Sequence, residues 1–520
     1  MAGSKIAFTI LLIGGSLAMG AAKPSVVRTH SGAISGVETT DGKVISFKGI
    51  PFAAPPVGQL RWRAPKPVTS WKNPLKADHF GASCMQGPNS ELLPWTKEFM
   101  YVTPVSEDCL FLNIWTPKLS PSAKLPVLVY IHGGAFTSGS GDVPVYDGEA
   151  LARTGMVIVT INYRLGALGF MAHPALTKES EHHSSGNYGL LDQIEALRWV
   201  KQNIGAFGGD VARVTIAGQS AGAMSVADLL ASPLAKGLFS GAIADSGIGG
   251  RGVPMRTLAE AEKAGETFAT AKKAASIEEL RALPASEFAR SGGRLGPFVD
   301  GWVVPENAVS ATEEKSGGSD VPVMTGFQAN DAALGGPPSS SAAQFQSRAK
   351  QLYGPMTDEF LKLYPAGSDA EAAQSGVASG RDRLKAGMYL WASKRAETHK
   401  SPVYIYYFDR AVPWPAHPEF GAFHSGELPY TFGNLQKFDR PWEPLDRKIS
   451  KMMMAYWKDF ANSGGPNDAL VPTWDPVDAR EPIVMRLGSD SGPIPVADAA
   501  KLDFWRRYFD SPQSRNAGPF

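Results

Sequence analysis

The chain is 520 residues long, 43% of them hydrophobic and 19% charged, with a formal net charge of +1. This balance provides ample apolar material for a large core, and it excludes the strongly basic character of proteins that attract nucleic acid electrostatically. At roughly 150 residues per domain the length allows about three domains, although large α/β enzymes often exceed that size within one domain. We find no internal repeat.

The N-terminal sequence, MAGSKIAFTILLIGGSLAMGAAKPSVV, has the pattern of a secretory signal peptide. One lysine precedes an apolar run over residues 6–19, and small residues lead to a cleavage site near Ala22. A membrane anchor is the alternative, but the run is shorter than the roughly 20 apolar residues that a spanning helix needs. We therefore expect residues 1–22 to be removed and the mature protein to be exported, periplasmic or secreted, without stable membrane insertion.

The chain has two cysteines, Cys84 and Cys109, and both lie in polar, loop-like sequence. An even pair of cysteines in an exported chain favours a disulfide over two inert thiols. A loop closed in this way stabilises the fold by roughly 3 kcal/mol in the loop-entropy model.

Six segments predict buried parallel strands, because each is a short β-branched or aromatic run bounded by Gly, Pro or Asn. They lie near residues 124–134, 155–164, 211–218, 237–247, 320–327 and 401–409. Between them are helix-length segments with apolar residues at helical spacing, such as residues 187–209 and 221–232. The alternation predicts an α/β fold with a large, mostly parallel central sheet flanked by helices. No polar linker divides the chain, so we expect residues 23–520 to form one domain.

The sequence VTIAGQSAGAMSV, residues 214–226, carries Gly-Gln-Ser-Ala-Gly where a β-branched strand meets a helical run. Glycines on both sides of Ser220 indicate a backbone turn too sharp for side chains, which displays the serine hydroxyl. The motif alone is a modest signal in a chain with 55 glycines, but its strand-to-helix context is that of a nucleophile elbow. The alternative is a glycine-rich turn with a serine that caps the helix.

A serine nucleophile needs an imidazole that takes its proton and an acid that orients the imidazole. We expect His424 as the base, because it follows the last predicted strand in a loop flanked by Gly and Ser. We expect Asp331 as the acid, because it follows another buried strand and so reaches the same edge of the sheet as Ser220. Weaker candidates for the base are His417 and His173, and competitors for the acid are Asp245, Asp300 and Glu306.

The segment YIHGGAF predicts donors for the negative oxygen of a tetrahedral intermediate. Gly133 and Gly134 leave their backbone N–H groups open to close approach by a substrate, and the Ala221 N–H follows the nucleophile directly. The alternative for His132-Gly133-Gly134 is an ordinary turn at the end of a strand.

Several long motifs, in a fixed order, resemble the type-B carboxylesterase family, the cholinesterase-like branch of the α/β-hydrolases, and its bacterial secreted members in particular. They are FKGIPFAAPPVGQLRWRAPKPV, SEDCLFLNIWTP, GNYGLLDQIEALRWVKQNIGAFGGD and YWKDFANSGGPN, and the resemblance covers nearly all of the mature chain. It implies an α/β-hydrolase fold with insertions around an active-site gorge. It also implies a catalytic Ser220, Asp331 and His424, an oxyanion hole of Gly133, Gly134 and Ala221, a supporting Ser246, and a Cys84–Cys109 disulfide.

Two residues depart from the family pattern. The residue before the nucleophile is usually glutamate, whereas Gln219 is neutral and should stabilise a protonated His424 less. The acid is more often glutamate, so the shorter Asp331 requires its loop to lie slightly closer to the histidine.

We therefore expect an exported serine esterase that cleaves small-molecule carboxylic esters through an acyl-enzyme, with no metal or organic cofactor. An amidase or peptidase with the same machinery is one alternative, and a non-catalytic adhesion protein on the same fold is another. The sequence of residues 250–320 and 333–400 indicates neither the acyl nor the alcohol part of the substrate. Candidates to line an apolar substrate pocket are Trp95, Phe136, Trp302, Trp414 and Phe423. Candidates to bind a carboxylate on the substrate are Arg164 and Arg251.

Overall fold

The computed structural model describes residues 25–248, 255–289, 295–314, 318–331, 341–467 and 471–516. The expected signal peptide and Arg251 lie outside these described residues.

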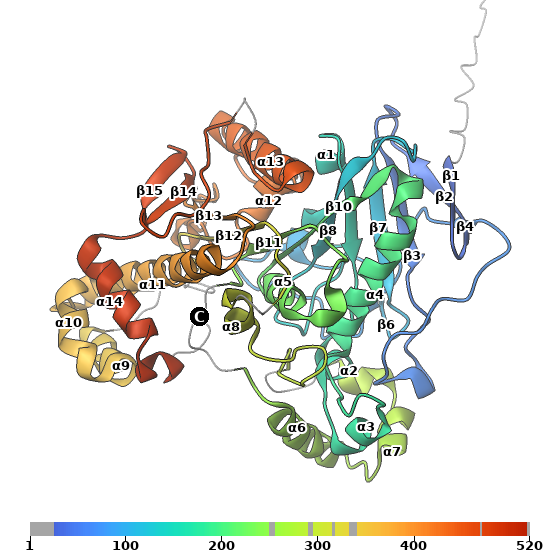
Figure 1. The fold of residues 1–520 in the computed structure, drawn as a ribbon, viewed down its shortest axis with the longest axis horizontal. Helices are drawn as coiled ribbons and strands as arrows, with labels where there is room; N and C mark the ends of the chain where they lie inside the picture. The colour runs from blue at the N-terminus through green and yellow to red at the C-terminus, as the bar shows by residue number, and fades with distance from the viewer. Residues whose placement is uncertain are drawn as a thin grey trace, which may run out of the picture.

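A twisted sheet forms the centre of the molecule (Figure 1). Its strands run in the order β1-β2-β3-β7-β9-β8-β10-β11-β12-β13-β14-β15, with β4 paired to β2. Their bounds are β1 Ser25–Thr29, β2 Gly32–Glu38, β3 Ile45–Pro51, β4 Leu75–Lys76, β7 Phe111–Thr116, β8 Leu125–Ile131, β9 Val157–Ile161, β10 Gly209–Gln219, β11 Gly241–Asp245, β12 Val323–Gln328, β13 Val403–Phe408, β14 Ile483–Leu487 and β15 Gly492–Pro495. A separate parallel pair joins β5 Ser83–Cys84 to β6 Val105–Ser106.

The six segments predicted as buried strands are β8 to β13, and they lie side by side as β9-β8-β10-β11-β12-β13. All of these neighbours are parallel, as is the pair β13–β14. Antiparallel strands complete both sides of the sheet, with β1, β2, β3 and β7 on one side and β15 on the other. The prediction of an α/β fold with a large, mostly parallel sheet is therefore confirmed.

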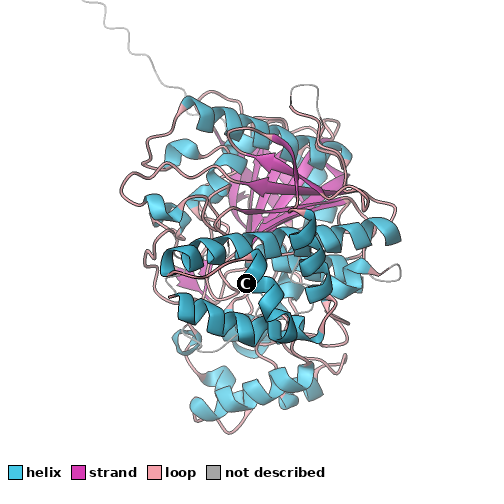
Figure 2. Cartoon of the chain, turned by 90° about the vertical axis from the view of Figure 1, so that its left-hand side faces the viewer, coloured by secondary structure: helices cyan, strands magenta, loops and turns pink. Residues whose placement is uncertain are grey.

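Fourteen α-helices surround the sheet in the described residues (Figure 2). Their bounds are α1 Glu149–Ala152, α2 Gly166–Phe170, α3 Pro174–Glu179, α4 Tyr188–Asn203, α5 Ala221–Ala231, α6 Leu258–Ala271, α7 Ile277–Ala282, α8 Ala308–Glu313, α9 Ala342–Tyr353, α10 Thr357–Leu363, α11 Asp369–Thr398, α12 Leu428–Thr431, α13 Pro444–Ser463 and α14 Ala499–Phe509. The long α11 packs against β13, and α9 and α14 pack against α11.

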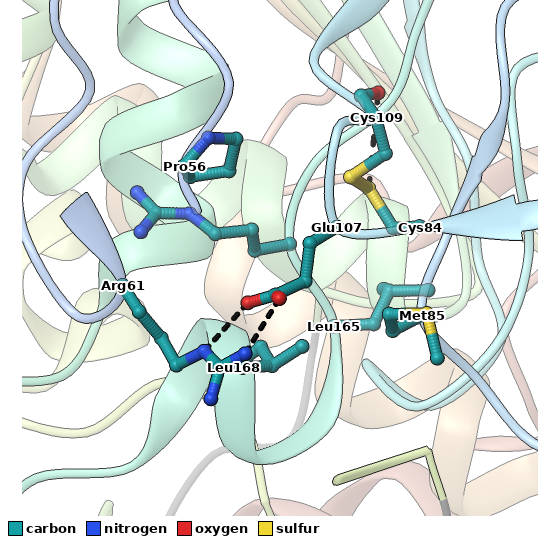
Figure 3. Close-up of a pocket in the computed structure, with 9 residues that line it drawn as sticks. Pro56, Arg61, Cys84, Met85, Glu107, Cys109, Leu165 and Leu168 are labelled. Atoms are coloured by element: carbon teal, nitrogen blue, oxygen red, sulfur yellow. Dashed lines mark hydrogen bonds and ion pairs between the residues drawn. A yellow bond between two sulfur atoms is a disulfide. The ribbon is translucent and has the colours of Figure 1, made fainter. Parts of the chain in front are cut away.

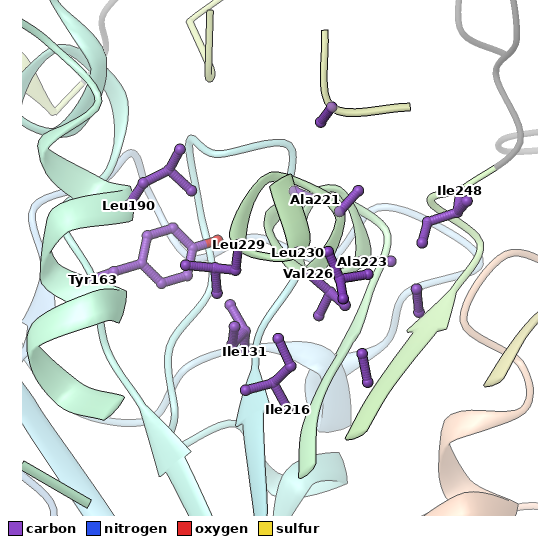
Figure 4. Close-up of a cluster of buried hydrophobic side chains, with 14 of the residues drawn as sticks. Ile131, Tyr163, Leu190, Ile216, Ala221, Ala223, Val226, Leu229, Leu230 and Ile248 are labelled. Atoms are coloured by element: carbon purple, nitrogen blue, oxygen red, sulfur yellow. The ribbon is translucent and has the colours of Figure 1, made fainter. Parts of the chain in front are cut away.

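The two faces of the sheet carry separate apolar cores, because successive side chains of a strand point to opposite faces. Along β8, Val129 and Ile131 belong to the cluster that contains α4 and α5. The alternate residues Leu128 and Tyr130 belong to the cluster that contains α13. Figure 4 shows Ile131 and Ile216, from neighbouring strands, beneath the apolar face of α5. This packing fixes the N-terminus of α5 above the ends of β8 and β10.

Cys84 and Cys109 form a disulfide, as the sequence predicts, with their Cα atoms 4.9 Å apart. The bond closes the loop between residues 84 and 109. Among the residues that the structure describes, no helix is both long enough and apolar enough to cross a membrane.

Candidate active site

Ser220 lies between the last residue of β10 and the first residue of α5. Its backbone has φ 59° and ψ −124°, an unfavourable conformation for a residue with a side chain. Two hydrogen bonds hold it there: its N–H donates to the Asp245 carbonyl at 2.9 Å, and its own carbonyl accepts from the Met224 N–H at 2.9 Å. The strained turn displays the hydroxyl at the carboxyl edge of the sheet.

The glycines around Ser220 are required by close backbone contacts. A Cβ on Gly222 would lie 2.0 Å from the Ile131 carbonyl oxygen, and a Cβ on Gly218 would lie 2.5 Å from the Gly222 carbonyl carbon. Any side chain at either position would push the turn away from the end of β8. The Gly-x-Ser-x-Gly spacing thus follows from packing between the turn and the neighbouring strand.

His424 and Asp331 are buried, 6% and 2% exposed, and joined by a hydrogen bond between Nδ1 and Oδ1. They lie in the loops after β13 and β12, which are adjacent parallel strands. Asn330 ties the two loops together, because its N–H donates to the Ala422 carbonyl and its Oδ1 accepts from the Ala422 N–H, both at 3.0 Å. The shorter aspartate therefore reaches the imidazole because its loop is held against the histidine loop.

Gln219 connects this pair to the serine turn. Its side-chain nitrogen lies 3.1 Å from Nε2 of His424. Since Nδ1 donates its proton to Asp331, Nε2 is the acceptor of a hydrogen bond from the Gln219 amide. The imidazole thus lies between Asp331 and the residue next to Ser220.

Ser246 is connected to Asp331 only indirectly, through Gln328. The Ser246 hydroxyl donates to Gln328 Oε1 at 2.6 Å. The Gln328 N–H donates to Asp331 Oδ2 at 3.4 Å, and its carbonyl accepts from the Asp331 N–H at 3.1 Å. Ser246 therefore bonds Gln328, which in turn contacts the Asp331 carboxylate. It is not a partner in the hydrogen bond between Asp331 and His424.

The turn after β8 contains Gly133 and Gly134, whose N–H groups we expect to serve as oxyanion donors. Nδ1 of the buried His132 lies 2.8 Å from the Gly133 carbonyl oxygen, and burial lowers the pKa of His132 to about 4. The neutral ring donates this bond, which directs the Gly133 carbonyl toward His132. In a trans peptide the Gly134 N–H then points the opposite way. A Cβ on Gly133 would lie 3.2 Å from the Cβ of Ser220, so this turn lies directly against the candidate nucleophile.

Two more carboxyl groups, Asp245 and Glu427, are buried beside Asp331. Burial and the charge of Asp331 raise the pKa of Asp245 to about 7, against a 2.8 Å hydrogen bond from the Tyr406 hydroxyl that lowers it. Burial, with the charges of Asp245 and Asp331, raises the pKa of Glu427 well above its usual range. Neither Glu427 oxygen has a hydrogen-bond partner among the described residues. A neutral Glu427 avoids a second negative charge beside Asp331. Glu427 was not singled out from the sequence, although it lies only three residues after His424.

The competing residues have other partners. Tyr406 engages Asp245, His173 caps α3 by accepting from the Ala175 N–H, and Asp300 accepts from backbone N–H groups at Trp302 and Val304. His417 pairs with Glu419 on the surface, and Glu306 is exposed.

Arg164 also has a structural partner, because Nε and Nη2 donate to the buried Asp192 at 2.8 and 2.7 Å. It lines a cavity of about 10 Å³ beside the disulfide, where Arg61 and Glu107 form an ion pair with two 2.6 Å bonds (Figure 3). This cavity holds at most one water molecule and includes neither Ser220 nor His424 in its lining.

Of the aromatic residues considered for an apolar pocket, Trp95 and Phe423 lie at the histidine loop. The Trp95 ring is edge-on to the His424 ring, with centroids 6.4 Å apart. Trp302 instead stacks on His182, Trp414 lies under Arg440, and Phe136 packs against Phe170.

Comparison with known proteins identifies the chain's relatives. A family model described as the carboxylesterase family matches residues 23–505. The chain belongs to this family. Fumonisin B1 esterase of Sphingopyxis macrogoltabida is 37% identical to this carboxylesterase, over 94% of this chain and 92% of the relative. Para-nitrobenzyl esterase of Bacillus subtilis is 36% identical, over 86% and 91%.

Solved structures agree with the sequence relatives. A structure of PNB esterase superimposes with a TM-score of 0.80 and 32% identity, covering 93% of this carboxylesterase and 99% of the other chain. The fold is therefore the α/β-hydrolase fold, and the enzyme class is carboxylic ester hydrolase.

Proposed function

We propose that Ser220, His424 and Asp331 are the catalytic triad of an esterase that works through an acyl-enzyme. The observation that carries this proposal is the His424 imidazole, which bonds Asp331 through Nδ1 and presents Nε2 beside the strained turn of Ser220. The relatives' names, fumonisin and para-nitrobenzyl esterase, support a small-molecule carboxylic ester as substrate.

In the first half of the reaction, Ser220 Oγ attacks the ester carbonyl carbon while Nε2 of His424 takes the hydroxyl proton. Asp331 stabilises the imidazolium that forms and holds its tautomer. The negative carbonyl oxygen is bound by the N–H groups of Gly133, Gly134 and Ala221, the last at the positive end of α5. The imidazolium then protonates the leaving alcohol.

In the second half, His424 takes a proton from water, which attacks the acyl-enzyme carbonyl. The tetrahedral intermediate collapses, the Ser220 oxygen recovers its proton from His424, and the carboxylic acid leaves. Each proton that the imidazole accepts is returned within the same half-reaction.

Replacement of Ser220 by alanine tests this proposal. Hydrolysis of p-nitrophenyl acetate by S220A should fall to the rate without enzyme, and an organophosphate reagent should label the unmodified protein at Ser220 but not the variant. S240A, which removes a hydroxyl bonded to the Val214 carbonyl, is the matched control and should keep full activity. Turnover by S220A would exclude Ser220 as the nucleophile.

The same measurements address the two alternatives. An amidase would hydrolyse p-nitroacetanilide at a rate comparable to the matched ester, whereas we expect a strong preference for the ester. A non-catalytic adhesion protein would show neither turnover nor a burst of p-nitrophenol.

We further propose that residues 23–520 form a single catalytic domain that is exported after cleavage near Ala22. The Cys84–Cys109 disulfide supports export, because such bonds persist in oxidising compartments. Cell fractionation with N-terminal sequencing tests this, and the expected mature N-terminus is Lys23.

A further inference from the structure

The loop closed by the disulfide contacts the histidine loop at three successive residues. The indole N–H of Trp95 donates to the Ser425 hydroxyl at 3.3 Å. The Trp95 ring meets the His424 ring edge-on, at 82° and 6.4 Å. Phe99 packs against Phe423 with ring centroids 6.1 Å apart. These contacts are additional to the hydrogen bonds that the imidazole makes with Asp331 and Gln219.

The disulfide loop is itself held by hydrogen bonds near both of its ends. Gln86 exchanges two 2.9 Å hydrogen bonds with the backbone of Gly139. The carboxylate of the buried Asp142 accepts from the N–H groups of Thr103 and Val102, at 2.9 and 3.3 Å. Trp95 is thus attached to a segment with fixed ends and can serve as an anchor for a neighbouring loop.

Ser425 is the residue that needs an anchor. It is 5% exposed and has φ 79°, in the left-handed region where glycine is comfortable and serine is strained. Glycine would relieve the backbone at this position, but it would remove the hydroxyl that accepts the Trp95 bond. The serine therefore combines an unfavourable backbone with a specific side-chain contact, directly after the catalytic base.

We propose that Trp95 is a positioning residue for His424, acting through its hydrogen bond to Ser425. The bond fixes the backbone on the C-terminal side of the imidazole, while Asp331 fixes the ring from the other side. This inference rests on the proposed function, in which His424 is the base. A loosely held base spends less time in the orientation that accepts the serine proton, so the effect falls on kcat.

Two variants remove the bond from opposite ends. W95F keeps an aromatic ring but lacks the indole N–H, and S425G lacks the hydroxyl while relieving the strained backbone. We expect each to lower kcat for p-nitrophenyl acetate by about three- to tenfold, the range of one hydrogen bond, with KM nearly unchanged. The melting temperature of S425G should equal or exceed that of the unmodified protein, so lower kcat with unimpaired folding separates positioning from stability.

The matched control is W71F, which also removes an indole N–H donor, here one bonded at 2.7 Å to the Ala33 carbonyl in the antiparallel part of the sheet. It should leave kcat and KM unchanged. The double variant W95F/S425G should lose no more activity than either single variant, because both remove the same bond.

Three outcomes would overturn the inference: unchanged kcat in W95F and S425G, additive losses in the double variant, or a rise in KM with constant kcat. The last would make Trp95 a wall of the substrate pocket. Failure of the proposed function is distinguishable, because it would appear as turnover by S220A, whereas failure of this inference leaves S220A inactive.

Discussion

Asp331 accepts a hydrogen bond from Nδ1 of His424 across the junction of two loops that follow adjacent strands. The residues are 93 positions apart in the chain, yet the parallel pairing of β12 and β13 brings the ends of both strands to one edge. A carboxylate there both selects the tautomer with an unprotonated Nε2 and stabilises the imidazolium.

D331N should reduce kcat by about 10⁴-fold with little change in KM, because asparagine supports the wrong tautomer and carries no charge. Steady-state kinetics with p-nitrophenyl acetate measures this effect. D331E restores a carboxylate and should retain more activity than D331N. A loss below tenfold in a correctly folded D331N would point to another acid.

Q219E should move the acid limb of the pH–rate profile to higher pH. The side-chain nitrogen of Gln219 lies 3.1 Å from Nε2, and a carboxylate in its place would favour the protonated imidazole, which is inactive as a base. The profile of kcat/KM from pH 4 to 9 measures the shift. Q59E adds the same charge at an exposed site and should leave the limb in place; a shift of equal size there would contradict a local effect.

G133A should lose about 100-fold or more in kcat. The new Cβ would lie 2.7 Å from the Gln219 carbonyl oxygen, so the turn that carries the proposed oxyanion donors must move away from Ser220. G205A is the control, because a Cβ there meets no atom within 4 Å. Comparable kcat values for the two variants would show that the turn does not supply the donors.

D245N should stabilise the protein more at pH 8 than at pH 4. The pKa of Asp245 rises from 3.8 to about 7 on folding, so the folded state pays an ionisation cost that is absent below pH 4, grows between pH 4 and 7, and is complete above that range. This change in pKa corresponds to about 4 kcal/mol in the free energy of unfolding. Asp331, Glu427 and Tyr406 lie in the same buried region as Asp245.

Urea denaturation of both proteins at the two pH values gives the free energies of unfolding. D439N removes a carboxylate at an exposed position, so its free energy of unfolding should differ little from that of the unmodified protein at either pH. A D245N gain that is independent of pH would mean that Asp245 does not titrate on unfolding in this range.

The double variant C84S/C109S should unfold at lower urea concentration, with a loss of about 3.5 kcal/mol for a loop of 25 residues. The bond restricts the unfolded chain, which is why its loss lowers the free energy of unfolding. Dithiothreitol should lower the stability of the unmodified protein and leave the variant unaffected. Equal stability of both proteins without reductant would show that the disulfide contributes nothing.

The strands at the centre of the sheet were predictable because both of their faces are buried. β9, β11 and β13 are buried along their whole length and mostly apolar, and such runs are recognisable locally. The antiparallel strands were not predicted. β2 is only partly buried, and β15 has two prolines in four residues, so pairing with neighbours decides their conformation.

Ser220 illustrates what the chain determines alone. Its flanking glycines indicate a sharp backbone turn. The strand before the turn and the helix after it are both recognisable within the same 13 residues, 214–226. The neutral Gln219 is equally plain, but its bond to His424 depends on a loop 205 residues away.

The sequence by itself determined the alternation of strands and helices, the serine turn and the glycine-rich turn after β8, and it led to the prediction of His424 and Asp331 as base and acid. Only the tertiary structure decided the buried carboxyls around Asp331 and the contact of Trp95 with Ser425. Local patterns record what neighbouring residues impose on the backbone, whereas burial and contacts between distant loops arise only after the sheet brings its strand ends together.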